Sequence, residues 1–161
     1  MSDTSTQQIL TILQLLEQNR AGEALAEIQV LLARSPDHGK AQALYGHILM
    51  TYLKDYAAAE EAFRIAMRQA PTYVDLYYSY GELLIILDKG TETVAVLNKA
   101  LEVPGIAKNK IYQLFGQLYE RQSAWNDAVE YYTKAIFYSL NDLEVAQYQA
   151  AITRVKGKMG L

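Results

Sequence analysis

Apolar residues recur at intervals of three and four along most of the chain, which is typical of helices that bury one face. Tyr112, Phe115 and Tyr119 show this spacing. Strand-like alternation is absent over any useful length. Short segments rich in Asn, Asp, Ser and Gly separate the periodic runs and supply helix stop and cap signals. The pattern predicts helices near 5–18, 21–34, 40–53, 56–69, 73–88, 91–102, 108–121, 125–138 and from about residue 142.

The periodic runs repeat along the chain. Gly46, Gly81 and Gly116 are spaced by 35 residues, each after an aromatic residue and two positions before an aliphatic one. A second set of positions recurs in the helix that follows: Ala24, Ile28 and Leu31; Ala59, Phe63 and Ala66; Thr93, Leu97 and Ala100; Ala128, Tyr132 and Ala135. Prolines at 36, 71 and 104 end the first three units, because proline blocks helix continuation. The sequence therefore predicts a series of antiparallel helix pairs.

The glycines lie inside predicted helices, where glycine costs roughly 1 kcal/mol relative to alanine. We expect the missing side chain at Gly116 to let a facing side chain enter and the two helices approach closely. Ala128 is a small residue on the partner helix, and Tyr112, Tyr119 and Tyr132 can fill the remaining space. Burying one aromatic side chain contributes roughly 1.5–3 kcal/mol, which outweighs the loss of helix propensity.

This combination of periodic residues resembles the tetratricopeptide repeat. The unit at 109–140 matches best, with Tyr112, Phe115, Gly116, Tyr119, Trp125, Ala128, Tyr132 and Ala135 at signature positions. The units at 74–104 and 40–72 also match, the latter with one extra residue, whereas Thr11 replaces the glycine in a degenerate unit at 5–38. The resemblance implies one all-α domain over 1–161, folded as a right-handed superhelix of helix pairs.

A last helix, at 142–158, is expected to cap the stack, because the terminal element of a repeat array needs a polar outer face. Leu143, Ala146, Ala150 and Val155 are predicted to cover the last pair. Glu144, Gln147, Gln149 and Arg154 are predicted to face water. The basic end of this helix suits the negative end of the helix dipole. On the second helix of another pair, Glu60 and Glu61 are expected to be solvated.

The resemblance also implies a concave groove lined by the first helix of each pair. The positions flanking the packing stripe are Ala43, Leu44, His47, Met50, Thr51, Tyr78, Ser79, Glu82, Ile85, Ile86, Gln113, Leu114, Gln117, Glu120 and Arg121. From these we predict contacts to a partner at Leu44, His47, Tyr78, Ser79, Glu82, Gln113, Gln117 and Arg121. Some members of the family grip a C-terminal carboxylate with Lys, Arg and Asn, but the matching positions of the first three units hold none. Most tyrosines are assigned to packing, with Tyr78 exposed in the groove.

The amino-acid composition excludes several classes of function. The 161 residues carry a net charge of −3 and contain no cysteine, so thiolate metal sites and disulfides are impossible. A nucleic-acid partner is not expected without a basic surplus. No positively charged leader or apolar run of membrane-spanning length is present, and a cytoplasmic location is the expectation. His38 and His47 are the only histidines, and no metalloprotease or phosphate-loop signature occurs. His47, expected beside Glu82, is interpreted as a contact residue, so no enzyme activity, metal or cofactor is predicted.

The sequence thus predicts a non-enzymatic adaptor or scaffold that binds a protein or peptide segment in its groove. Two alternatives remain open. One is self-assembly as a homodimer through the N-terminal helix, whose Ile9, Leu10, Ile12, Leu13, Leu15 and Leu16 exceed the needs of one packing face. The other is a small bacterial secretion chaperone, which is similar in size, acidity and repeat number.

Overall fold

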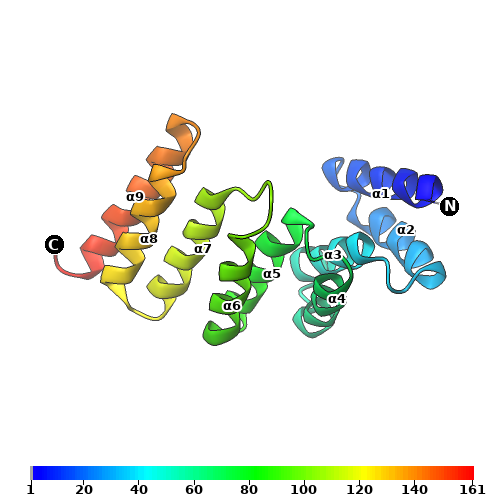
Figure 1. Cartoon of the computed structure of the whole chain (residues 1–161), viewed down its shortest axis with the longest axis horizontal. Coiled ribbons are helices and arrows are strands. Elements are labelled where there is room, and N and C mark those ends of the chain that lie inside the picture. Colours follow the sequence, from blue (N-terminus) through cyan, green and yellow to red (C-terminus); the bar gives the residue numbers. More distant parts are fainter. Residues whose placement is uncertain (1) are drawn as a thin grey trace. The chain divides into compact units, whose positions relative to one another are not determined.

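The computed structural model describes residues 2–161. Within them it contains no strand, and its α-helices are α1 (Ser2–Glu17), α2 (Ala21–Arg34), α3 (Gly39–Ile48), α4 (Tyr56–Gln69), α5 (Val74–Ile86), α6 (Gly90–Ala100), α7 (Lys108–Arg121), α8 (Trp125–Phe137) and α9 (Asp142–Lys158) (Figure 1). A π-helical turn, η1 (Leu49–Leu53), directly follows α3. The all-α prediction is confirmed, and the helix bounds match the predicted ones to within three residues when α3 and η1 are counted together.

The chain forms two compact units, an N-terminal unit up to Ser79 and a C-terminal unit from Tyr80 on. In the N-terminal unit α1 packs on α2, α2 on α3 and α3 on α4. In the C-terminal unit α6 packs on α7, α7 on α8 and α8 on α9. The boundary falls inside α5. The expected single domain over 1–161 stays a prediction.

The first helix of each pair is followed, within two residues, by a residue in the left-handed conformation that often terminates helices. These residues are Asn19, Lys54, Asp88 and Ser123, with φ between 56° and 58°. In three of the four turns the following amide donates to the carbonyl five residues earlier: Arg20 to Leu15, Lys89 to Leu84 and Ala124 to Tyr119. The polar breaks seen in the sequence are therefore the turns of helical hairpins.

The turn at Lys54 differs because the second pair carries one extra residue. Gly46 and Ala59 are 13 residues apart, whereas the matching residues of the next two pairs are 12 apart. The π-helical turn η1 takes up the extra residue, since a π turn inserts one residue into an α-helix. The amide of Asp55 then donates to the carbonyl of Leu49 at 3.0 Å, and the second helix keeps its face toward the first.

The periodic glycines make room for a large side chain of the second helix, as predicted. A Cβ atom would lie 2.6 Å from the Phe63 ring at Gly46, 2.9 Å from Leu97 Cδ2 at Gly81 and 2.6 Å from the Tyr132 ring at Gly116. Phe63, Leu97 and Tyr132 occupy the same position of their repeats. At Gly116 the entering group is thus Tyr132 itself, which is 1% exposed.

The core of the N-terminal unit takes in most of the apolar residues of α1. Ile12 is fully buried among α2 and α3 residues such as Ile28 and Ile48. Ile9, Leu13, Leu15 and Leu16 pack partly against the same core. Six apolar residues of α1 were predicted to form a dimer seam. Of these six, only Leu10 is exposed, with 48% of its surface accessible to solvent.

The core of the C-terminal unit corrects the predicted face of α9. Leu143 is 69% exposed, and Ala146 and Ala150 are exposed too, so three of the four predicted packing residues were wrong. The packing face instead contains Tyr148, Ala151 and Val155, with Ile152 and Met159 partly buried. The tyrosines assigned to packing are confirmed: Tyr77, Tyr80 and Tyr132 are buried, and Tyr112 and Tyr119 are packed against buried residues.

A second correction concerns Glu60, which was expected to be solvated. It is 8% exposed, and its Oε1 accepts a hydrogen bond from Arg64 Nη2 at 2.7 Å. Arg64 lies four residues on along the same helix, a spacing at which side chains can pair. Glu61 is exposed as predicted.

Candidate functional site

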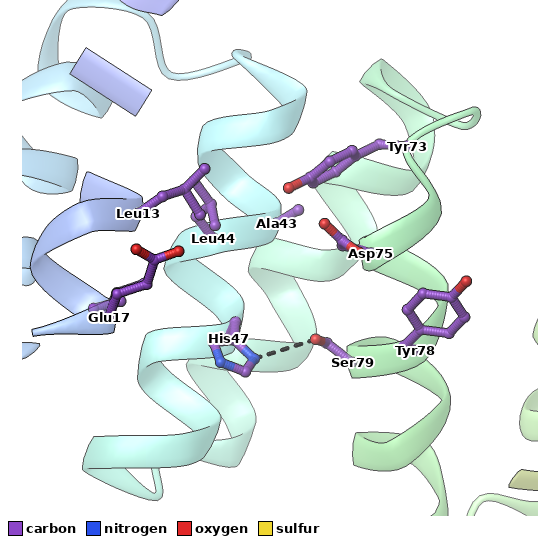
Figure 2. A pocket seen from close by; sticks show the side chains of 10 residues that line it. Leu13, Glu17, Ala43, Leu44, His47, Tyr73, Asp75, Tyr78 and Ser79 are labelled. Carbon is purple, nitrogen blue, oxygen red and sulfur yellow. Dashed lines mark hydrogen bonds between the residues drawn. The ribbon is translucent and has the colours of Figure 1, made fainter. Parts of the chain in front are cut away.

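A cleft opens between three helices of the N-terminal unit. We call it the N-terminal cleft; it has a volume of about 320 Å³ and is lined by Leu13, Leu16, Glu17, Ala43, Leu44, His47, Tyr73, Asp75, Tyr78 and Ser79. Figure 2 shows α1 contributing Leu13 and Glu17, α3 contributing Leu44 and His47, and the start of α5 contributing Asp75 and Ser79. All four contact residues predicted in this unit, namely Leu44, His47, Tyr78 and Ser79, line this one cleft.

Local packing fixes the α3 wall of the cleft. The helix begins at Gly39, where the ring nitrogen Nδ1 of His38 accepts from the amide of Ala41 at 3.3 Å and caps the helix. Gly46 then holds α3 against the ring of Phe63. Because the glycine faces α4, Leu44 and His47 lie on the flanking side that borders the cleft.

The α5 wall is fixed by a tyrosine anchor. The buried Tyr77 donates its hydroxyl hydrogen bond to the carbonyl of Pro71 at 2.6 Å and ties the helix to the preceding turn. Tyr78 and Ser79, the next residues, are half-buried at the cleft. His47 Nδ1 lies 3.2 Å from Ser79 Oγ, which links the α3 and α5 walls (Figure 2).

The floor of the cleft is apolar, and acidic groups stand at its edge. Ala43 and Leu44 are buried, whereas Glu17 and Asp75 are exposed. Burial, with the neighbouring Asp75 carboxylate, raises the pKa of Tyr73 to about 12, so this phenol stays protonated. Its hydroxyl is therefore a neutral hydrogen-bonding group in the cleft wall.

The cleft continues into an adjoining recess. This recess shares Leu13, Tyr73 and Asp75 with the cleft and adds Thr6, Ile9, Leu10, His38 and Lys40. The Lys40 ammonium lies 5.7 Å from the centre of the Tyr73 ring, a cation–π distance. Together the two hollows form a continuous surface from α1 to the start of α5.

Sequence reasoning missed five residues of the cleft: Leu13, Leu16, Glu17, Tyr73 and Asp75. The signal was present for the two leucines, since α1 carries more apolar residues than one packing face needs. The surplus was interpreted as a dimer seam, whereas the structure places Leu13 and Leu16 in the cleft wall. No periodic signal marks Glu17 or Asp75.

In the C-terminal unit, three of the four predicted contact residues share a shallower hollow. Glu82, Gln117 and Arg121 line it together with Ile85, Ile86, Glu120 and Lys158. Gln113 does not line this hollow, and its Oε1 accepts from the Tyr148 hydroxyl at 3.5 Å. Arg121 is also paired, because its Nε donates to Asp88 Oδ1 at 2.5 Å and this pair lowers the pKa of Asp88.

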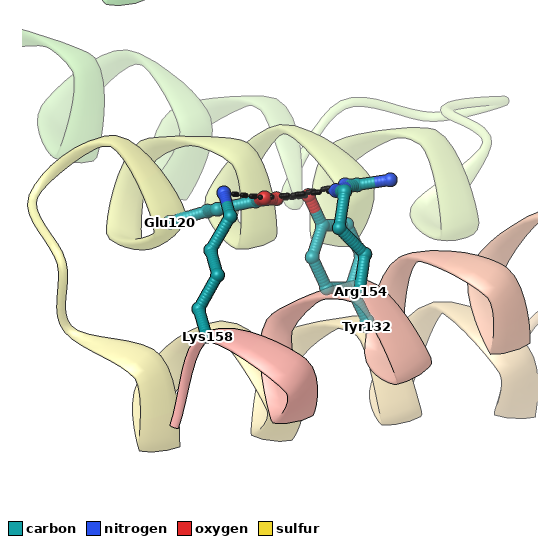
Figure 3. Close-up of polar contacts among 4 residues, drawn as sticks. All are labelled: Glu120, Tyr132, Arg154 and Lys158. Carbon is teal, nitrogen blue, oxygen red and sulfur yellow. Dashed lines mark hydrogen bonds and ion pairs between the residues drawn. The ribbon is translucent and has the colours of Figure 1, made fainter. Parts of the chain in front are cut away.

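Glu120, expected in the groove, ties α7 to the capping helix. Its carboxylate accepts from Arg154 Nε and Nη2 at 2.9 and 2.8 Å, from Lys158 Nζ at 2.8 Å and from the Tyr132 hydroxyl at 2.9 Å (Figure 3). These donors, Arg154 first, lower the pKa of Glu120 to about 2. Arg154 and Lys158 therefore bind Glu120, while the Arg154 side chain remains exposed, as expected from the sequence.

Two of the predicted flanking residues, Met50 and Leu114, line none of these hollows. Both side chains are buried in the core. In residues 2–161 no group of three His, Asp or Glu side chains is placed to hold a metal ion. Over the same residues no helix combines the length and apolar character needed to cross a membrane.

No protein-family model and no curated protein matches the sequence, but solved structures match the fold. PilW, a "widely conserved type IV pilus biogenesis factor", is similar over 98% of this chain and 72% of its own, at 21% identity and a TM-score of 0.83. TTC0263, a "thermophilic TPR protein" of Thermus thermophilus, is similar over 88% and 78%, at 20% identity and 0.74. YrrB, a "TPR protein with an unusual peptide-binding site", is similar over 95% and 76%, at 18% identity and 0.71. Together with the periodic helix pairs, these similarities show that the chain has the all-α tetratricopeptide-repeat fold.

Proposed function

We propose that the chain is a non-enzymatic adaptor that binds a segment of a partner protein on the first helices of its pairs. The N-terminal cleft carries this proposal, because four residues predicted as contacts from repeat position alone line one open hollow. Its mixture of apolar floor and a few convergent polar groups is typical of binding sites. The peptide-binding site named for YrrB, which has a similar fold, supports the same class of function.

The cleft is suited to side chains of a peptide. Its volume of about 320 Å³ is at the lower end of the range for small-molecule pockets. Its walls come from successive repeats, so an extended or helical segment could lie across them and insert one or two side chains. The polar residues Glu82 and Gln117 of the C-terminal unit are proposed as further contacts.

Self-association is the competing function, and one observation favours it. Phe137, Leu140 and Leu143 are 80%, 89% and 69% exposed at the turn between α8 and α9. Exposed apolar groups this close in sequence are a common feature of protein interfaces. Solution mass by light scattering, with a Leu140→Glu variant, separates this function from partner binding.

A steric block tests the proposed function. Random dodecapeptides displayed on phage are selected on the wild-type chain, and the best peptide is synthesised with a fluorescent label for affinity measurement. In Ser79→Trp a bulky side chain replaces a half-buried serine at the cleft, so the affinity should fall at least about tenfold. Ala57→Trp, at an exposed position of α4, is the matched control and should bind as the wild type does.

The peptide affinities of the variants can be compared only if the variants are folded equally well. Circular dichroism must show equal helicity and melting temperature for the two variants before their affinities are compared. Equal binding of the peptide by wild type and Ser79→Trp would refute the cleft as the binding site. If the selection yields no peptide that binds, the proposed function is wrong for the N-terminal unit.

A further inference from the structure

The charges at the N-terminal cleft are all of one sign. Glu17 stands at the end of α1 and Asp75 in the first turn of α5, and both are exposed. Among the residues that line the cleft, none is Lys or Arg. A ligand in the cleft therefore meets carboxylates and no fixed positive charge.

Neither carboxylate is paired with a cation of residues 2–161, and Asp75 lies beside the Tyr73 phenol. In the part of the chain that the structure describes, the ion pairs involve other acids, and neither Glu17 nor Asp75 takes part in one. Lys40 lines the adjoining recess, which shares Asp75 with the cleft, and its ammonium lies over the Tyr73 ring. A partner can thus satisfy Glu17 and Asp75 without displacing an internal cation.

The C-terminal unit shows the opposite arrangement. Glu120 is held by Arg154 and Lys158, and Asp88 is held by Arg121. If Glu120 or Asp88 bound a partner, its ion pair within the chain would first have to break. The two units therefore differ in the charge that they offer. The C-terminal hollow is lined by Arg121, Lys158 and only one acid without an ion pair among residues 2–161, Glu82, whereas the N-terminal cleft is lined by two such acids and by no Lys or Arg.

We propose that the occupant of the N-terminal cleft is a peptide segment with an apolar side chain next to Lys or Arg. The apolar side chain lies on Ala43 and Leu44, and the cation approaches Glu17 and Asp75. This inference rests on the proposed function, since it names the partner chemistry of the same site. The proposed cleft also differs from a groove that binds the C-terminal carboxylate of a peptide, because Glu17 and Asp75 would repel that carboxylate.

The two parts of the segment contribute differently. Burial of the apolar side chain provides most of the affinity, since it removes apolar area from water. The exposed carboxylates at the rim raise the association rate and the selectivity, and their effect weakens as salt screens them. A segment that carries acidic residues at the same positions is rejected by like-charge repulsion.

Charge-neutral variants test the inference on the same dodecapeptide selection. The peptides selected on wild type should place Lys or Arg beside an apolar residue more often than the unselected library does. In Glu17→Gln/Asp75→Asn the volume of both side chains is kept and the negative charge is lost. The dissociation constant for the best wild-type peptide should rise by about 2- to 30-fold, as expected for two exposed ion pairs, and its salt dependence should flatten.

Asp37→Asn/Glu61→Gln is the matched control. It removes the same net charge from exposed positions of the N-terminal unit that do not line the cleft, so its affinity should equal that of wild type. A loss of equal size in both double variants would mean that only net charge matters and would overturn the inference.

The results distinguish this inference from the function on which it rests. If Ser79→Trp abolishes binding but Glu17→Gln/Asp75→Asn does not weaken it, the cleft binds peptides and the basic partner is wrong. Selected peptides without enrichment of Lys or Arg would overturn the inference in the same way. If Ser79→Trp binds normally, or if no peptide is selected, the proposed function fails and the inference fails with it.

Discussion

Replacing Gly116 with alanine should destabilise the chain, although alanine is the better helix former. Alanine gains about 1 kcal/mol of helix propensity. Its Cβ would lie 2.6, 2.7 and 2.8 Å from Cε1, Cδ1 and Cζ of Tyr132. This ring cannot swing away easily, because it is 1% exposed and its hydroxyl donates to Glu120 at 2.9 Å.

The magnitude follows from the two opposing effects. Overpacking a well-packed core costs about 1–3 kcal/mol, and three rigid ring atoms closer than 3.0 Å place Gly116→Ala in the upper half of that range. After subtraction of the propensity gain, the free energy of unfolding should fall by about 1–2 kcal/mol. The melting temperature should fall by about 2–8 °C.

Urea denaturation followed by circular dichroism measures this loss, and the chain provides its own control. Gly157 lies in α9, where an added Cβ would meet no atom within 4 Å. Gly157→Ala should therefore leave the stability unchanged or raise it by up to about 1 kcal/mol. A Gly116→Ala variant as stable as Gly157→Ala would refute the packing explanation of the periodic glycines.

A second variant tests the identity of the contact. In the repeat of Gly81, the residue that fills the glycine position is Leu97, a smaller and more flexible side chain. We therefore expect Gly116→Ala to cost less in a Tyr132→Leu background than in wild type. Strict additivity of the two changes would show that Gly116 and Tyr132 are not coupled.

Two further predictions concern the attachment of α9. Glu120→Gln should lower the free energy of unfolding by about 1–2 kcal/mol at about pH 7, allowing for the half-exposed Arg154 and Lys158. The pKa of Glu120 falls from 4.5 to about 2 on folding, so its carboxylate stabilises the fold above about pH 4.5. The difference from wild type should shrink as the pH falls toward 2, and a pH-independent difference in urea titrations would contradict this. Tyr148→Phe should cost about 1–3 kcal/mol, because the buried Asn109 Nδ2 donates to the Tyr148 hydroxyl at 3.2 Å and would lose its acceptor; unchanged melting would show that this bond contributes nothing.

The helices and their pairing could be predicted from the sequence because these features are periodic. Gly46, Gly81 and Gly116 mark the same place in three pairs, and the large residue of each following helix marks the other side of the contact. The extra residue in the second pair was visible as well. Its consequence, the π-helical turn η1, was not, since the same residue could have lengthened the turn instead.

The face of α9 could not be predicted, because apolar residues occur on more than one side of this helix. Leu143 and Tyr148 compete for the packing position, and periodicity does not rank them. Tyr148 is buried because its ring joins the α8 core while its hydroxyl meets Asn109 and Gln113 on α7. These partners are 39 and 35 residues away, so the choice depends on tertiary contacts.

The same long-range contacts decide which predicted contact residues remain available to a partner. From the sequence, equivalent positions of successive repeats were expected to play the same role. The structure shows that they differ, because some of these residues form ion pairs with other residues of the chain. Glu120 and Arg121 follow the repeat pattern of the groove, yet their charges are matched by Arg154, Lys158 and Asp88 within the C-terminal unit. Breaking such pairs to bind a partner recovers little free energy, because one charge contact replaces another.

The α3 residues that line the N-terminal cleft are apolar or weakly polar. The carboxylates of Glu17 and Asp75 form no ion pair among residues 2–161. A partner that buries an apolar side chain there and brings a cation to the rim breaks no ion pair of the chain. The free energy of binding should therefore come mainly from the N-terminal unit. For the same reason, Glu17→Gln/Asp75→Asn should weaken peptide binding more than Glu82→Gln, which removes an exposed carboxylate from the hollow of the C-terminal unit. The opposite order of affinities would mean that the C-terminal unit provides the main contacts, despite its internal ion pairs.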